Sequence, residues 1–138
     1  MKQKLKCILL VDDNEADNFI HTRVIKKMGC AEEIKAVRGG QEALDYLTSL
    51  TENHIPQPEL IFLDINMPSM NGFEFLERYQ KTIPKELRNI VIMMLTTSLN
   101  PDDRLRSDTI EEVKDYKNKP LTKKLLTEIL EMHYPSAL

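Results

Sequence analysis

The chain has 138 residues, of which 41% are hydrophobic, and a net charge of -3. This length and apolar content suit one domain with a buried core, so a second domain is not expected. Because lysine and arginine are scattered among the acidic residues, the composition predicts neither a nucleic-acid partner nor an anionic membrane partner.

The N-terminal sequence MKQKLKCILLVDD does not have the pattern of a targeting segment. The chain has no apolar run of the roughly 18 residues that a membrane-spanning helix needs. Paired acids also stand where a signal peptide would have small residues before its cleavage site. We therefore expect a cytoplasmic protein, in which Cys7 and Cys30 could form a bridge but fit two reduced structural thiols better.

Apolar runs alternate with amphipathic runs along the chain. In chain order, the sequence predicts a strand at 6–11, a helix at 15–28, a strand at 33–37, a helix at 39–50, a strand at 60–63, a helix at 72–82, a strand at 89–95, a helix that begins at Asn100, a strand at 112–116 and a helix at 122–133. This repeating order predicts five parallel strands with helices on both faces, joined by right-handed crossovers.

The first predicted helix carries an apolar stripe and ends at Gly29. The residues of this stripe are Phe19, Ile20, Val24, Ile25 and Met28. The helix that begins at Asn100 has a different signature, because Asn100 is a helix-capping residue and Pro101 suits the first turn.

Polar side chains follow the central strands at the points where they end. Asp12 and Asp13 follow the first strand, Asp64 the third, Thr96 the fourth and Lys119 the fifth. In an open parallel sheet, ligands bind outside the carboxyl ends of the strands, so these residues are expected to converge. Each residue taken alone also suits a turn, a helix cap or an ordinary surface position.

Three carboxylates that meet in one cleft repel one another unless cations are present. Lys119 supplies one positive charge, and an all-oxygen ligand set suits Mg²⁺. A carboxylate on a rigid strand end beside a metal can attack a phosphoryl group and form an aspartyl phosphate, which is the role that suits Asp64.

Four motifs, ILLVDDNEAD, IFLDINMPSMNG, MLTTS and YKNKP, occur in this order. As an ordered set over essentially the whole chain, they resemble the receiver domain of bacterial two-component response regulators. The resemblance implies an α/β, flavodoxin-like fold, with a doubly wound sheet of five parallel strands in the order 2-1-3-4-5 and five helices.

The resemblance also implies roles for the acidic residues. Asp64 matches the phosphoacceptor, which takes a phosphoryl group from a phosphohistidine on a sensor histidine kinase or a phosphotransfer protein. Asp13 matches the residue that binds Mg²⁺ directly, and Asp12 contributes mainly through water. Asn66 would give its backbone carbonyl to the metal, which Asp64 also ligates.

Three further residues match positions that respond to the phosphoryl group. Lys119 matches the lysine that contacts the phosphoryl oxygens, and its bond to Pro120 is expected to be cis. Thr96 matches the hydroxyl that moves to the phosphoryl group, and Tyr116 matches the aromatic ring that turns inward. The resemblance therefore implies a two-state switch built from Thr96 and Tyr116.

Two segments depart from the pattern of the family. The small residues common before the fifth strand are replaced by IEEVKDY, which weakens inferences about partner recognition. The segment 82–89 lengthens the connection before the fourth strand. These features resemble stand-alone receivers, such as chemotaxis regulators, more than the receivers of transcription factors.

We therefore expect a phosphorylation-dependent switch that catalyses at most its own phosphorylation and dephosphorylation. Because the chain ends at Leu138, soon after the fifth helix, no output domain is expected. The downstream protein target is unknown and would dock on the face formed by the fourth helix, fifth strand and fifth helix, and the protein would be a monomer or a weak dimer. His21, His54 and His133 are expected to be surface or packing residues.

Three alternatives stay open at this point. The chain could be a phosphorelay intermediate. A Mg²⁺-dependent phosphatase of the haloacid dehalogenase type is disfavoured, because Asn66 stands where such enzymes need a second aspartate as general acid. An interaction module that is never phosphorylated is disfavoured because it would have no need of buried charge.

Overall fold

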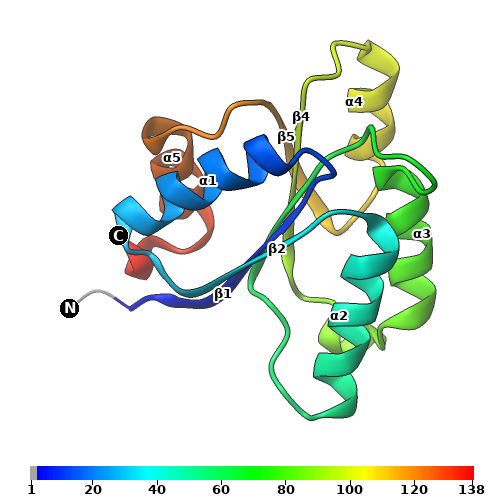
Figure 1. Cartoon of the computed structure of the whole chain (residues 1–138), viewed down its shortest axis with the longest axis horizontal. Helices are drawn as coiled ribbons and strands as arrows, with labels where there is room; N and C mark the ends of the chain where they lie inside the picture. The colour runs from blue at the N-terminus through cyan, green and yellow to red at the C-terminus, as the bar shows by residue number, and fades with distance from the viewer. Residues whose placement is uncertain (1–2) are drawn as a thin grey trace.

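The computed structural model, which describes residues 3–138, has one five-stranded parallel sheet in the order β2-β1-β3-β4-β5 (Figure 1). The strands are β1 (Leu5–Val11), β2 (Ala31–Val37), β3 (Leu60–Leu63), β4 (Val91–Thr96) and β5 (Val113–Asn118). The helices are α1 (Glu15–Met28), α2 (Gly40–Glu52), α3 (Gly72–Thr82), α4 (Pro101–Asp108) and α5 (Lys123–His133). This architecture confirms the predicted fold class and strand order.

The sheet separates two apolar cores. Helices α2 and α3 cover one face of the sheet, and α1 and α5 cover the other (Figure 1). Because β1, β3 and β4 are covered on both faces, their residues form nearly unbroken apolar runs, as parallel strands in a doubly wound sheet do. None of the helices within residues 3–138 combines the length and the apolar character that crossing a membrane would need.

The apolar stripe predicted for α1 is only partly buried. Ile25 is buried, but Phe19 and Ile20 are 64% and 47% exposed, so the prediction was wrong for these two residues. The buried side of α1 carries Asn18 and His21 instead. The first turns of α1 lie beside polar groups at the end of β1, because the Asn18 side chain donates a hydrogen bond to the backbone carbonyl of Asp12.

The helix ends follow the sequence signals closely. Asn14 accepts a hydrogen bond from the backbone N–H of Asp17 at the start of α1, and Gly29 ends that helix with a φ of 63°. Asn100 caps α4, and Pro101 stands in its first turn, as predicted. These caps fix where each helix begins relative to the strand before it.

The segment 82–89 contains a short 3-10 helix, η1 (Lys85–Leu87). Directly after η1, Arg88 forms an ion pair with Glu112, which precedes β5, at 3.4 Å. Through Arg88, the longer connection between α3 and β4 therefore contacts the residue that precedes the edge strand β5.

Candidate functional site

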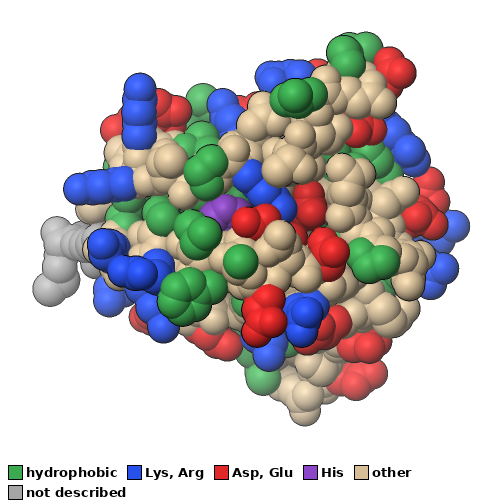
Figure 2. Space-filling model, turned by 45° about the horizontal axis from the view of Figure 1, so that its top comes forward, with side chains coloured by type: hydrophobic (Ala, Val, Ile, Leu, Met, Phe, Trp, Pro, Cys, Tyr) green, Lys and Arg blue, Asp and Glu red, His purple; other side chains and the backbone are tan. Residues whose placement is uncertain are grey.

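The sheet brings the predicted site residues to one edge. Asp12 and Asp64 directly follow β1 and β3, which are adjacent and pair Val11 with Leu63. Figure 2 looks onto this part of the molecule and shows acidic and basic side chains in contact near its centre. The polar strand ends predicted from the sequence therefore meet in space.

Three carboxylates form an acidic cluster at this edge. Asp12, Asp13 and Asp64 each offer an oxygen atom, and these atoms lie within 4.8 Å of one another. Asp12 and Asp64 are buried, whereas Asp13 is half-buried. Oxygen donors at this spacing are the ligands that a hard divalent cation such as Mg²⁺ prefers, so these residues fit a metal site.

Asp64 is buried beside other charged and polar groups, which shift the pKa of its carboxyl group. Burial raises the pKa of its carboxyl group above the usual value of 3.8, and the nearby charge of Asp12 raises this pKa further. The positive charge of Lys119 and a hydrogen bond from Thr96 act in the opposite direction and lower it. The backbone N–H of Ile65 donates to Asp64 Oδ1 at 2.9 Å, which fixes the carboxylate at the strand end.

Lys119 is the cation at the centre of the site. Its Nζ atom lies 2.6 Å from Asp12 Oδ2, 2.9 Å from Asp17 Oδ2 and 3.5 Å from Asp64 Oδ2. Burial alone would lower the pKa of Lys119, but the hydrogen bonds with Asp12 and Asp17 hold it above its usual value. The bond between Lys119 and Pro120 is cis, as the resemblance implies.

Sequence reasoning did not single out Asp17 or Asn18. Both stand in the first turn of α1, where an acidic or amide residue is explained by helix capping and the helix dipole alone. Only the fold shows that Asp17 contacts Lys119, which lies far away in the sequence. The residues 14–17 (NEAD), which follow the paired aspartates, show no sequence pattern that would predict this contact.

The loop after Asp64 turns sharply under the site. The backbone N–H of Gly72 donates to the carbonyl of Ile65 at 2.8 Å, which closes the loop. A Cβ atom on Gly72 would lie 2.6 Å from the carbonyl oxygen of Asp64, so only glycine fits there without a shift. Asn66 lies within this loop with its side chain exposed.

Thr96 and Tyr116 are connected through one loop residue. The backbone N–H of Ser98 donates to Thr96 Oγ1 at 3.2 Å, and the Tyr116 hydroxyl donates to the Ser98 carbonyl at 3.0 Å. Both side chains are buried, and the Arg104 guanidinium lies 5.8 Å from the centre of the Tyr116 ring. The ring of Tyr116 therefore already occupies a buried position in this structure.

A small internal cavity lies behind the carboxylates. Its lining includes Asp12, Asp64, Asn18 and His21. The Oδ1 atom of Asn18 is buried there with no hydrogen-bond partner, and burial lowers the pKa of His21. His21 is therefore a packing residue at the back of the site, as the sequence suggested.

Comparison with known proteins places the chain among signalling domains. Residues 8–131 match the family described as the response regulator receiver domain. The chain is 35% identical over 115 residues to the probable methanogenesis regulatory protein FilR2 of Methanothrix harundinacea, and the match covers 83% of this chain and 72% of that protein.

Solved structures give the same result. A two component response regulator from Cytophaga hutchinsonii superposes with a TM-score of 0.88 at 30% identity, and the match covers 96% of this chain and 99% of that one. The Mn²⁺-bound form of the response regulator Rcp1 has a TM-score of 0.71 at 32% identity, with 92% of this chain and 90% of that chain covered.

Proposed function

Since this chain belongs to the family of response regulator receiver domains, we propose that it is a phosphorylation-dependent switch with Asp64 as phosphoacceptor. Receiver domains act in two-component signalling and interact with histidine kinases or phosphotransfer proteins. The observation that best supports this role is the meeting of Asp12, Asp13 and Asp64 beside Lys119 at the carboxyl ends of the strands.

The chemistry follows from this arrangement. A carboxylate oxygen of Asp64 attacks the phosphorus of a phosphohistidine, the bond between phosphorus and the imidazole nitrogen breaks, and the histidine leaves with the electron pair. The phosphoryl group then carries more negative charge than the carboxylate did. Lys119, which is 3.5 Å from Asp64, and the hydroxyl of Thr96 are the groups that would contact its oxygens.

Mg²⁺ is the metal that we assign to the acidic cluster. Asp12, Asp13 and Asp64 would hold it, with the backbone carbonyl of Asn66 as a further ligand. When bound, the ion supplies positive charge that screens the carboxylates from the incoming phosphoryl group. The solved Mn²⁺-bound form of Rcp1 supports divalent metal binding by this chain.

Phosphorylation itself provides the direct test. Incubation with acetyl phosphate and Mg²⁺ should add one phosphoryl group to the wild type, detected by intact mass. Asp64→Asn should abolish this gain, whereas Asp45→Asn, which changes an exposed carboxylate on α2, should retain it. Labelling that persists in Asp64→Asn would refute the assignment of the acceptor.

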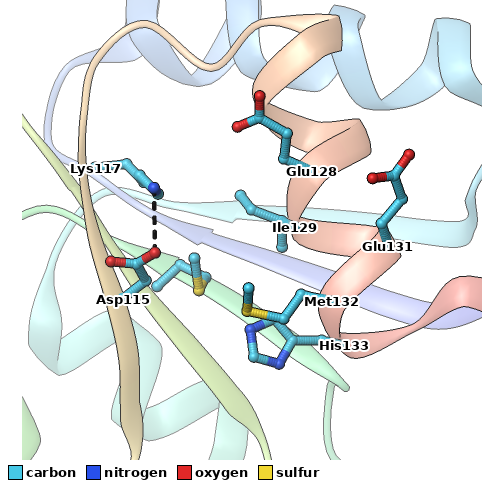
Figure 3. Close-up of a pocket in the computed structure, with 8 residues that line it drawn as sticks. Asp115, Lys117, Glu128, Ile129, Glu131, Met132 and His133 are labelled. Atoms are coloured by element: carbon cyan, nitrogen blue, oxygen red, sulfur yellow. Dashed lines mark ion pairs between the residues drawn. The ribbon is translucent and has the colours of Figure 1, made fainter.

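We propose that the output surface lies over α4, β5 and α5. A pocket of about 440 Å³ opens between β5 and α5, and Figure 3 shows Ile129 and Met132 of α5 reaching towards β5. Asp115 and Lys117 form an ion pair on the β5 side at 3.2 Å. Met132 of α5 is exposed on this surface, and Tyr116 lies in β5 between Asp115 and Lys117. Because Tyr116 is linked to Thr96 through Ser98, a change at Thr96 would reach a partner here through β5.

Nuclear magnetic resonance tests this surface. Phosphorylation should shift backbone signals in α4, β5 and α5 more than those in α2. Shifts confined to α2 and the rest of the opposite face would contradict the proposed output surface, while leaving the phosphoacceptor assignment intact.

A further inference from the structure

The ammonium group of Lys119 lies closer to α1 than to the proposed phosphoacceptor. Its Nζ atom is 2.9 Å from Asp17 Oδ2, within hydrogen-bond distance, but 3.5 Å from Asp64 Oδ2. The Lys119 side chain is only 9% exposed, so water has little access to compete for these contacts. In the resting protein, Lys119 is therefore bound mainly by Asp12 and Asp17.

Asp17 is held firmly in position. Its backbone N–H donates to the capping side chain of Asn14 at 3.0 Å, and the next residue, Asn18, bonds to the carbonyl of Asp12. The Asp17 side chain is 28% exposed, so its charge is partly shielded from solvent. The contact with Lys119 is thus made by a carboxylate on a fixed turn of a helix.

Asp17 stands apart from the metal ligands. Within residues 3–138, the acidic group able to hold a metal ion consists of Asp12, Asp13 and Asp64. A divalent cation held by that group would compete with Lys119 for Asp12 but not for Asp17. Asp17 would then be the carboxylate that still holds Lys119 when a phosphoryl group arrives.

We propose that Asp17 is a positioning residue that competes with the phosphoryl group for Lys119. An ammonium group has three hydrogen-bond donors, and Asp12 and Asp17 take two of those of Lys119, so a phosphoryl group on Asp64 can accept more than the third only if the ammonium moves away from α1. The charge of Asp17 opposes that movement and lowers the affinity of the site for a phosphoryl group. This inference rests on the proposed phosphoacceptor function and adds a residue that sets how strongly the phosphorylated state is stabilised.

The affinity for fluoroberyllate, a phosphoryl mimic, measures this competition. Titration calorimetry at saturating Mg²⁺ should show that Asp17→Asn binds fluoroberyllate roughly threefold to tenfold more tightly than the wild type, the range expected for a partly buried charged contact. The control is Glu15→Gln, which removes one negative charge from the same turn of α1 without touching Lys119. It should bind as the wild type does.

The same substitution in a Lys119→Gln background distinguishes an effect that acts through Lys119 from a general effect of removing a negative charge. In Lys119→Gln the gain from Asp17→Asn should disappear, because Asp17 is proposed to act through Lys119. An equal gain in that background, or no gain in the wild-type background, would overturn the inference. Failure of the wild type to bind fluoroberyllate would instead count against the proposed function and, with it, this inference.

The resting contact can be measured without any ligand. The ¹⁵N-labelled ammonium of Lys119 should exchange its protons with water more slowly than the ammonium groups of exposed lysines. Asp17→Asn should speed this exchange, whereas Glu15→Gln should not. An unchanged exchange rate in Asp17→Asn would show that Asp17 does not hold Lys119, and the inference would fail independently of phosphorylation chemistry.

Discussion

At the scale of single residues, the site keeps more negative charge than it can neutralise. Asp12 and Asp64 are buried at neighbouring strand ends, and both depend on the one ammonium group of Lys119. Such an arrangement disfavours ionised Asp64 in the folded protein. This unfavourable charge is the property that makes the site receptive to a cation, and it has a measurable effect on stability.

Asp64→Asn should stabilise the metal-free protein at neutral pH. The pKa of Asp64 is raised above 3.8, first by burial and then by Asp12. Below pH 3.8 the carboxyl is protonated in the folded and unfolded states alike, so it does not penalise folding. As pH rises from 3.8 to the raised pKa, the unfolded state loses its proton before the folded state does, so the fold loses stability; above the raised pKa the loss is complete.

Urea unfolding in the presence of a chelator measures this difference. The excess stability of Asp64→Asn over the wild type should be largest near pH 7 and should shrink as pH falls towards 4. Asp45→Asn, the exposed control, should change the unfolding midpoint little at either pH. A variant less stable than the wild type at pH 7 would show that contacts of the carboxylate outweigh its burial.

Gly72 is a second residue whose identity the site requires. Gly72→Ala would place a Cβ atom 2.6 Å from the Asp64 carbonyl, so the loop or the strand end must shift, and we expect a loss of about 1–3 kcal/mol in unfolding free energy. Gly39→Ala is the matched control, because the space that its methyl group would take is open to 4 Å and its φ of -175° is ordinary extended backbone. It should change stability by less than about 0.5 kcal/mol.

At the scale of elements, the sequence predicts where strands lie and where helices end better than it predicts which face of a helix is buried. The apolar runs of β1, β3 and β4 and the caps of α1 and α4 follow from local residue preferences, so they were predictable. Which face of α1 is buried could not be predicted in this way. That face is decided by polar contacts between Asn18 and Asp12 and between Asp17 and Lys119. Those contacts depend on which segments the fold brings together.

The connection between α3 and β4 provides an element-scale prediction. Arg88 and Glu112 pair at 3.4 Å with side chains that are only 17% and 11% exposed. Arg88→Ala would leave Glu112 with Gln80 as its remaining partner at 2.8 Å, and should lower the unfolding free energy by about 1–3 kcal/mol. Arg38→Ala, which breaks an exposed pair with Glu15, should lower it by less than about 1 kcal/mol.

Thermal or urea unfolding of the two variants measures whether the contact between Arg88 and Glu112 stabilises the edge strand β5. Equal, small losses for Arg88→Ala and Arg38→Ala would mean that the added segment contributes length alone. A larger loss for Arg88→Ala would show that the segment 82–89 stabilises the start of β5, next to the surface proposed for output.

At the scale of the whole molecule, strand order decides which residues meet. The alternation of strands and helices predicts a parallel sheet, but the order 2-1-3-4-5 came from the resemblance to receiver domains. This order places β1 beside β3 and β3 beside β4, so Asp12, Asp64 and Thr96 come from adjacent strands. Lys119 directly follows β5, where its backbone N–H donates to the carbonyl of Thr96, and its side chain reaches Asp64.

A metal bound at this convergence should stabilise the entire fold. Mg²⁺ that binds the folded chain and not the unfolded one raises the unfolding free energy by about 1.4 kcal/mol for each tenfold excess over its dissociation constant. Asp13→Asn should remove most of this gain. Because Asp13 is half-buried and lies outside the Lys119 contacts, the same variant should have nearly wild-type stability in a chelator.

Unfolding midpoints across a Mg²⁺ titration provide the measurement, with Asp45→Asn as the variant that should follow the wild type. The three carboxylates lie on two strand ends, so ligation would join β1 to β3 and relieve the repulsion around Asp64 at the same time. If millimolar Mg²⁺ left the wild-type midpoint unchanged, the acidic cluster would not act as a metal site. An interaction module that works without phosphorylation would then explain the chain better.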